Sequence, residues 1–358
     1  MSRAKIKVGV LGATGMAGQR YVDLLKDHPF FEISFLAASK QSAGKTYGEA
    51  VLGRWHMTEA LDERIASMEV YEISEVERAA DTCRLVFSAV SSELAREYEE
   101  HYANHELAVV SNASAHRWTK DVPMIVPEVN NGHLKVIEAQ RKRRSWKRAL
   151  MVVKPNCSLQ SYIMPLDALR RDYGLKRVIV TTLQSLSGAG HPGLSALDMV
   201  DNVVPYIGGE EEKSEKEPRK IFGKVDEGRI VEDESFSISA HCNRVNTLDG
   251  HLACVSVEFD VCPEEEAILD TWRSYQGYPQ EAKLPSAPEY PVVYTAEVDR
   301  PQVRRDRDIA RGMAASVGRL RSCPVFHWRF ACLSHNTIRG AAGGGVLIAE
   351  TLDAQGYL

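Results

Sequence analysis

The sequence predicts an α/β protein with two domains. The first would hold alternating strands and helices around a parallel sheet, and the second would be an α+β domain with longer strands. Three observations support this prediction: a strand, turn, helix and strand at the start, longer β-branched segments beyond residue 157, and small residues near the end. The chain has 358 residues, 44% of them hydrophobic, which is enough for about two domains.

The opening segment alternates apolar and polar residues over 5–10 and continues into a glycine-rich turn over 12–18, spaced G-x-x-G-x-x-G. A helical pattern follows up to Pro29, and residues 33–37 form a second apolar strand. In such a βαβ unit the glycines let the backbone approach a pyrophosphate at the helix N-terminus. Glycine-rich turns also occur for steric reasons alone, but the flanking strand and helix favour a Rossmann-type dinucleotide site. The expected cofactor contacts on this turn are Gly12, Thr14, Gly15, Met16 and Ala17.

The end of the second strand indicates which cofactor binds. An acidic residue there would hold the ribose hydroxyls of NAD, but residues 39–45 read Ser-Lys-Gln-Ser-Ala-Gly-Lys. Hydroxyls and cations suit a phosphate, so we predict NADP, with Ser39 and Ser42 as contacts. The alternative is an ordinary solvated loop with two lysines.

Further strands are predicted at 85–90, 107–110 and 150–153, the first two ending in serine-rich turns. Ligands bind outside the carboxyl ends of parallel strands, so residues 111–117 are expected to form a lip of the site. Arg117 could clamp an anion there, or it could pair with a surface carboxylate.

Cys157 directly follows the strand predicted at 150–153 and precedes a helix predicted at 159–169. At a helix start, free N–H groups and the helix dipole favour an anion, which would make the thiolate accessible near neutral pH. Cys157 is therefore a candidate nucleophile. The alternative is a small buried residue with no chemical role.

The second domain is expected to begin with a strand at 177–184 and a sharp turn at 185–193. Gln184 could donate to a carbonyl. A hairpin-like Asp249-Gly250 turn would present His251 at the head of a strand over 251–261, where it could shuttle protons, although a lone histidine is more often structural. The acidic stretch 208–217 is interpreted as an exposed helix start.

Small residues at 340–345 lead into a C-terminal helix that is expected to pack on the first domain. The predicted division is therefore 1–156 with 336–358 for the dinucleotide domain, and 157–335 for the catalytic and dimerisation domain.

Composition argues against several classes of protein. The net charge of −5 argues against nucleic acid, and the basic run 141–144 is interpreted as a solvated helix end. No apolar run approaches the length that crosses a bilayer and no signal-peptide core is evident, so we expect a cytoplasmic protein without a membrane partner. The seven cysteines include no Cys-x-x-Cys pair, which predicts neither a disulfide framework nor a metal site.

Together these residues closely resemble the aspartate-semialdehyde dehydrogenase family, in its archaeal and fungal-like branch. The resemblance runs nearly end to end. Its motifs are Gly12-Ala13-Thr14-Gly15, Ser42-Ala43-Gly44-Lys45, Pro155-Asn156-Cys157-Ser158, Gln184 with Ser187-Gly188-Ala189-Gly190, His241-Cys242-Asn243-Arg244, Asp249-Gly250-His251, Arg300-Pro301-Gln302, and Asn336 with Arg339-Gly340-Ala341.

The resemblance implies a glyceraldehyde phosphate dehydrogenase-like fold, a homodimer or homotetramer, and small-molecule substrates. The implied reaction is the NADPH-dependent reductive dephosphorylation of aspartyl phosphate to aspartate-β-semialdehyde, on the route to lysine, threonine and methionine. The implied catalytic residues are Cys157 as nucleophile, His251 as acid/base and Gln184 to orient the acyl group. The implied substrate contacts are Arg244 for the carboxylate, Arg117 and Lys213 for the phosphate, and Asn156 and Glu210 near the substrate. The implied cofactor contacts include Ser187, Gly188 and Asn336, the last at the nicotinamide carboxamide.

One departure from the family affects the cofactor. Where members often carry Ser-x-Arg-Ser, this chain has Gln41, so a cation for the 2′-phosphate is missing from that motif. Two alternatives to the leading function are a paralogous reductase of an acyl-CoA such as malonyl-CoA, and a dinucleotide-binding regulator without turnover. Both Cys157 and His251 are present, which counts against the regulator.

Overall fold

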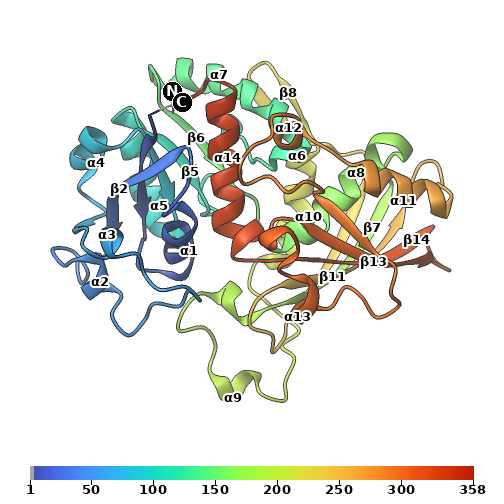
Figure 1. The fold of residues 1–358 in the computed structure, drawn as a ribbon. Coiled ribbons are helices and arrows are strands. Elements are labelled where there is room, and N and C mark those ends of the chain that lie inside the picture. The colour runs from blue at the N-terminus through green and yellow to red at the C-terminus, as the bar shows by residue number, and fades with distance from the viewer. Residues whose placement is uncertain (1–3) are drawn as a thin grey trace.

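A computed structural model describes residues 4–358; residues 1–3, which open the predicted first domain, lie outside the described part. Two six-stranded sheets form the framework, one toward the N-terminal half of the chain and one toward the C-terminal half (Figure 1). Between residues 4 and 358 no helix is both long and apolar enough to cross a membrane.

The first sheet has the strand order β3-β2-β1-β4-β5-β6, and every neighbouring pair is parallel. Parallel neighbours need crossover connections, which the predicted helices supply. This arrangement confirms the Rossmann-type half of the predicted fold. Its strands are β1 (Ile6–Leu11), β2 (Phe31–Ala38), β3 (Val70–Glu72), β4 (Leu85–Ser88), β5 (Ala108–Ser111) and β6 (Leu150–Val153). Its helices are α1 (Met16–Leu25), α2 (Tyr47–Ala50), α3 (Glu63–Ala66), α4 (Val76–Thr82), α5 (Ser92–Asn104), α6 (Pro127–Asn130), η1 (Asn131–Lys135) and α7 (Val136–Arg144).

The second sheet is mixed, in the order β10-β7-β11-β14-β13-β12. The hairpin-like pairing expected around Asp249-Gly250 is wrong, because β7 lies between β10 and β11 and pairs with both. The strands are β7 (Arg177–Gln184), β10 (Ser237–Arg244), β11 (His251–Glu258), β12 (Val292–Thr295), β13 (Ala315–Ser322) and β14 (Trp328–Ser334), with a separate ribbon of β8 (Lys224–Asp226) and β9 (Arg229–Val231).

Helices α8, α10 and α11 pack on one face of the second sheet, while Ile179, His241 and Cys254 are exposed on the strands. This mixed, one-sided layer confirms the α+β half of the predicted fold. Its helical elements are η2 (Ser158–Ser161), α8 (Ile163–Tyr173), η3 (Leu186–Ala189), α9 (Ala196–Met199), α10 (Glu210–Ile221), α11 (Glu265–Ser274), α12 (Tyr278–Glu281), α13 (Val303–Asp306) and η4 (Ile309–Gly312).

The last helix, α14 (Gly343–Ala354), follows the π-helical turn η5 (Ile338–Ala342) and packs against α1 and β5 of the first sheet. Gly345 makes this approach possible, since a Cβ there would lie 1.9 Å from the Tyr21 hydroxyl. The C-terminal helix therefore lies where the sequence suggested, beside the dinucleotide fold (Figure 1). The residue limits of the two domains stay a prediction.

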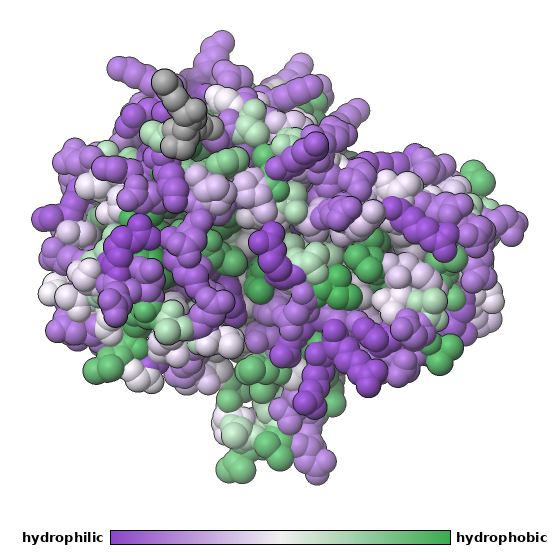
Figure 2. Space-filling view, in the orientation of Figure 1, coloured by the Kyte–Doolittle hydropathy of each residue, from purple (hydrophilic) through white to green (hydrophobic). Residues whose placement is uncertain are grey.

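A loop carrying α9 projects from the second half of the molecule (Figure 1). Figure 2 shows hydrophobic atoms gathered on this projection, and its exposed apolar residues are Leu194, Leu197, Val200, Val203 and Tyr206. Leu197 is 90% exposed. A set of apolar side chains facing water is typical of a surface that contacts a partner.

Candidate active site

The structure brings Cys157 and His251 together at the junction of the two sheets. Cys157 follows β6, and His251 is the first residue of β11. Their Sγ and Nε2 atoms are 3.3 Å apart, although 94 residues separate them in the chain. Cys157 is partly exposed and His251 is fully buried. The pair thus has the geometry of a nucleophile and its imidazole partner.

The segment after Cys157 differs from the helix predicted at 159–169. Cys157 caps the short 3₁₀ helix η2, and the α-helix α8 begins only at Ile163. The reason is local: Asn156 Oδ1 accepts from the Ser158 backbone and hydroxyl, and the Ser161 hydroxyl donates to the Ser158 carbonyl. Such side-chain bonds compete with regular helix. The expected α-helix dipole at Cys157 is therefore absent.

The electrostatics of the sulfur also differ from the expectation of a thiolate near neutral pH. Burial, followed by the nearby carboxylate of Glu210, raises the pKa of the Cys157 thiol to about 11, against the opposing effect of Lys154, Arg117 and Arg244. The free site therefore holds a thiol at neutral pH, and the expected low pKa was wrong.

His251 is held neutral. Burial, with Arg244 and His335 nearby, lowers its pKa to about 3. The Ser185 backbone N–H donates to Nδ1 over 3.0 Å, which assigns the ring proton to Nε2, the nitrogen that faces Cys157. Gly188 lies beside this ring, because a Cβ there would be 3.1 Å from the His251 Cε1. The imidazole is thus positioned to donate a hydrogen bond to the sulfur.

Gln184 and Arg244 end two paired strands, β7 and β10, where they are register partners. Both side chains are buried. Arg244 Nη1 donates to the Ser185 carbonyl over 2.7 Å, its one hydrogen bond from the side chain within residues 4–358. The rest of its guanidinium fork is available for a carboxylate. Gln184 Nε2 donates to Thr182 Oγ1 and to Glu210 Oε2.

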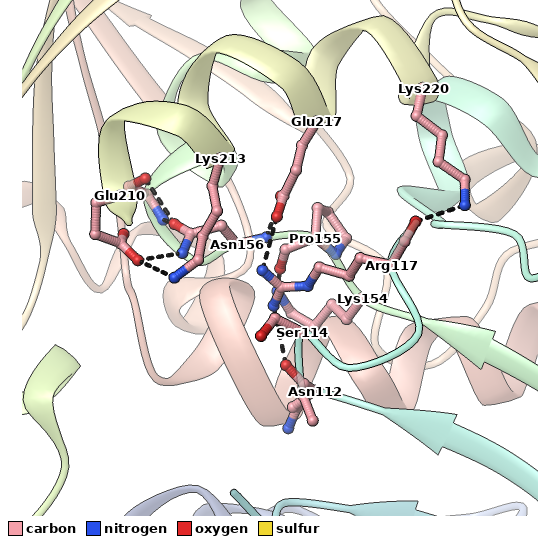
Figure 3. A network of polar contacts seen from close by, with 12 residues as sticks. Asn112, Ser114, Arg117, Lys154, Pro155, Asn156, Glu210, Lys213, Glu217 and Lys220 are labelled. Atoms are coloured by element: carbon pink, nitrogen blue, oxygen red, sulfur yellow. Dashed lines mark hydrogen bonds and ion pairs between the residues drawn. The ribbon is translucent and has the colours of Figure 1, made fainter. Parts of the chain in front are cut away.

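Glu210, at the start of α10, connects the other predicted substrate contacts. Its Oε1 accepts from Asn156 Nδ2 at 2.9 Å and from Lys213 Nζ at 2.8 Å (Figure 3). Glu210 is only 8% exposed, so the interpretation of this stretch as a merely exposed helix start was wrong for it. These contacts bring Glu210 and Lys213 to Asn156, the residue that directly precedes the nucleophile Cys157 in the chain.

Arg117 lies on the other side of the same network and is paired with Glu217, a residue that the sequence analysis missed. Arg117 Nη1 donates to Glu217 Oε1 at 2.7 Å, and the other oxygen of Glu217 accepts from the Asn156 backbone N–H at 2.6 Å (Figure 3). Both side chains are buried. The spacing of Glu210, Lys213 and Glu217 on a helix was the available signal, because i, i+3 and i+7 share one face.

The turn predicted to hold the dinucleotide fits that role. Gly12 has a φ of +75°, and a Cβ there would lie 2.6 Å from the Ala89 carbonyl. Gly15 caps α1, and a Cβ there would meet only the Gly12 carbonyl at 3.5 Å, so its missing side chain leaves room for a ligand. The first turn of α1, with Met16 and Ala17, carries no acidic residue and no side-chain cap, which leaves its N–H groups to an anion.

The remaining predicted cofactor contacts fall into two groups. Ser39 and Ser42 form a turn after β2, in which the Ser39 carbonyl accepts from the Ser42 N–H. Ser187 and Asn336 meet, since the Asn336 amide donates to the Ser187 hydroxyl at 2.8 Å, while its oxygen accepts from the Gly250 N–H.

Two family models match the chain. Residues 7–137 match the NAD binding domain of semialdehyde dehydrogenase, and residues 166–339 match its dimerisation domain. An aspartate-semialdehyde dehydrogenase from Methanothermobacter thermautotrophicus is 43% identical over 97% of this chain and 99% of its own length. The chain belongs to the aspartate-semialdehyde dehydrogenase family. The sequence-based identification of that family is therefore confirmed.

Other relatives extend the comparison. The crystal structure of the Candida albicans aspartate-semialdehyde dehydrogenase with NADP matches with a TM-score of 0.91 and 40% identity, covering 99% of this chain and 100% of that one. A malonyl CoA reductase (NADP) from Metallosphaera sedula is 39% identical over 99% of both chains. The chain is thus similar over nearly its full length to relatives named for either activity.

Proposed function

We propose that the protein is an NADP-dependent aspartate-semialdehyde dehydrogenase that reduces aspartyl phosphate through a thioester on Cys157. The observation that supports this most is the 3.3 Å contact of Cys157 Sγ with His251 Nε2, flanked by Arg244 and by the pair of Glu210 and Lys213. A thiol suits the reaction because sulfur both attacks and leaves readily.

The substrate would be held by its charges. Arg244 has a free guanidinium edge for the carboxylate, and Glu210 offers a carboxylate to the amine. Arg117 and Lys213 are proposed for the phosphate, and each is paired with a carboxylate of the chain, Glu217 and Glu210. Substrate phosphate would therefore compete for, or add to, these existing pairs.

The reacting groups start neutral, with a thiol at Cys157 and a neutral imidazole at His251. Cys157, which is partly exposed, would give its proton to water, and the thiolate would add to the acyl carbon while the Nε2–H of His251 donates to the sulfur and to the oxygen anion that forms beside it. Phosphate would then leave with the electron pair of the C–O bond, which gives the thioester. Gln184 would orient the acyl group. NADPH, held by the Gly12–Gly15 turn and by Ser187 and Asn336, supplies a hydride when bound.

An activity assay tests the proposal. Purified protein should reduce NADP when given aspartate-β-semialdehyde and phosphate, and Cys157→Ala should abolish turnover while NADP binding is retained. Cys262→Ala, an exposed cysteine outside the site, is the matched control and should keep full activity. Turnover by Cys157→Ala would refute the thioester route.

The relative that is named a malonyl-CoA reductase makes the acyl donor the main competing question. Reduction of malonyl-CoA with no activity on aspartate-β-semialdehyde would assign the chain to that paralogue. NADP binding without turnover of either substrate would instead indicate a regulator.

A homodimer or homotetramer is part of the proposal, because residues 166–339 match a dimerisation domain. The exposed strand residues Ile179, His241 and Cys254, together with the apolar projection around α9, supply surface for a second copy. Light scattering coupled to size exclusion would measure the assembly, and a monomer at micromolar concentration would contradict it. A cytoplasmic location, where NADPH and phosphorylated metabolites are available, completes the proposal, and cell fractionation would test it.

A further inference from the structure

The turn after β2 carries Lys40 and Lys45 but no cation at position 41, between Ser39 and Ser42. At the end of the second strand an NADP-binding chain needs a positive group for the 2′-phosphate, and position 41 holds an exposed, neutral Gln41. Ser42 of the same turn is buried, at 2% exposure. A buried hydroxyl is a good phosphate partner, but by itself it brings no charge.

Arg54, from the loop after α2, reaches this turn. Its Nη2 donates to Ser42 Oγ at 3.2 Å. Its Nε also donates to the Ala50 carbonyl at 2.9 Å, and Nη2 shares that acceptor at 2.6 Å. The guanidinium is therefore fixed beside Ser42 before any ligand arrives, which lowers the entropy lost on binding.

The Arg54 side chain is also not neutralised. Within residues 4–358 no carboxylate pairs with it, and Nη1 makes no hydrogen bond. An arginine that only satisfied the carbonyl at the end of α2 would need the hydrogen bonds to Ala50 alone. That structural role does not explain the additional hydrogen bond to Ser42. A fixed guanidinium with an open edge next to a buried hydroxyl suits a phosphate.

The same loop is tied to the turn that would hold the pyrophosphate. Gln19, buried on α1, donates from Nε2 to the carbonyls of Thr14 and Arg54, at 3.0 and 2.9 Å. Its oxygen accepts from the His56 N–H at 2.8 Å. The Gln19 side chain thus fixes the backbone of Arg54 relative to the glycine-rich turn. The expected pyrophosphate site and Arg54 are therefore held in one fixed arrangement.

We propose that Arg54, with Ser42, binds the 2′-phosphate of NADP and supplies the cation that position 41 lacks. The inference rests on the NADP dependence proposed above, and it assigns cofactor selectivity to a residue outside the β2 turn.

Isothermal titration of the full chain with NADP, NAD and 2′,5′-ADP tests the assignment without turnover. Arg54→Ala should weaken NADP and 2′,5′-ADP about 10- to 100-fold and leave NAD unchanged, because a charge-assisted contact to the phosphate is lost. Arg54→Lys should restore part of the affinity. Arg64→Ala removes an arginine that donates to the Lys26 carbonyl beyond the other end of α1, and should change none of the three.

Three results would overturn the assignment: unchanged NADP affinity in Arg54→Ala, an equal loss for NADP and NAD, or a selective loss in Lys40→Ala in place of Arg54→Ala. Equal affinity of the unaltered chain for NADP and NAD would also overturn it while leaving the Cys157 chemistry intact. The converse outcome is that Cys157→Ala binds NADP selectively while the unaltered chain has no dehydrogenase activity. This pair of results would refute the proposed function and leave the role of Arg54 standing.

Discussion

The state of the Cys157 thiol gives the sharpest quantitative prediction. With a pKa of about 11, the free chain holds about one thiolate in 10⁴ at pH 7 and about one in ten at pH 10. The rate of alkylation should therefore rise about a thousandfold between these pH values. An ordinary cysteine with a pKa near 8.5 gains only about 30-fold over the same range and levels off.

The assay is the rate of carbamidomethylation of the peptide that contains Cys157, measured by mass spectrometry without substrate. A short cysteine peptide in the same solution serves as the reference, and circular dichroism verifies that the chain stays folded at pH 10. A rate at Cys157 that reaches a plateau by pH 8.5 would refute the reasoning, because it would require a thiolate near neutral pH.

The cause of the raised pKa can be tested in the same experiment. The Glu210 carboxylate is the second cause after burial, so Glu210→Gln should lower the pKa of Cys157. A shift of about half to one unit makes alkylation at pH 8 about 3 to 10 times faster. Glu212→Gln, an exposed neighbour on the same helix, should change nothing. An equal acceleration in both variants would mean that the effect is not local.

Three further predictions concern other parts of the molecule. Gly188→Ala should lower kcat/KM about 100-fold with little loss of stability, because the added Cβ would lie 2.9 Å from Arg244 Nη1 and displace the guanidinium. Steady-state kinetics would measure this loss, and full activity of the variant would contradict it. Glu217→Ala should lower the free energy of unfolding by about 3–5 kcal/mol in urea, because the buried Arg117 loses its carboxylate; a cost below about 1 kcal/mol would be inconsistent with the pair. Glu99, buried, has its pKa raised to about 7 by desolvation, so the folded chain binds the proton more tightly than the unfolded one and stability falls as pH rises from about 4.5 to 7. Glu99→Gln should therefore stabilise the chain by about 2–3 kcal/mol in urea at pH 8 and by little at pH 4.5, and an equal effect at both values would contradict this.

The features that could be predicted from the sequence are those set by nearby residues. The glycine turn, the strand before Cys157 and the parallel first sheet follow from local patterns, because period, glycine placement and strand length are written within a few residues. Cys157 and His251 were identified separately, and their contact then required only that the end of β6 and the start of β11 meet.

The features that could not be predicted depend on contacts between distant segments. Arg117 pairs with Glu217 across 100 residues, and β7 inserts between β10 and β11. The low pKa predicted for the Cys157 thiol was wrong for the same reason. Burial and the Glu210 carboxylate raise that pKa only in the folded chain, whereas the sequence suggested only a helix start. Arg54 was missed because it lies outside both the glycine-rich turn and the turn after β2. Its hydrogen bond to Ser42 forms only in the folded chain.

The most direct test of the central claim is the mass of the protein after it reacts with aspartate-β-semialdehyde and NADP without phosphate. Without the acceptor, the thioester should accumulate, and the chain should gain one aspartyl acyl group located by peptide mapping on Cys157, with one NADPH formed per site. An NADPH burst with no added mass, or an acyl group on a different cysteine, would contradict the account.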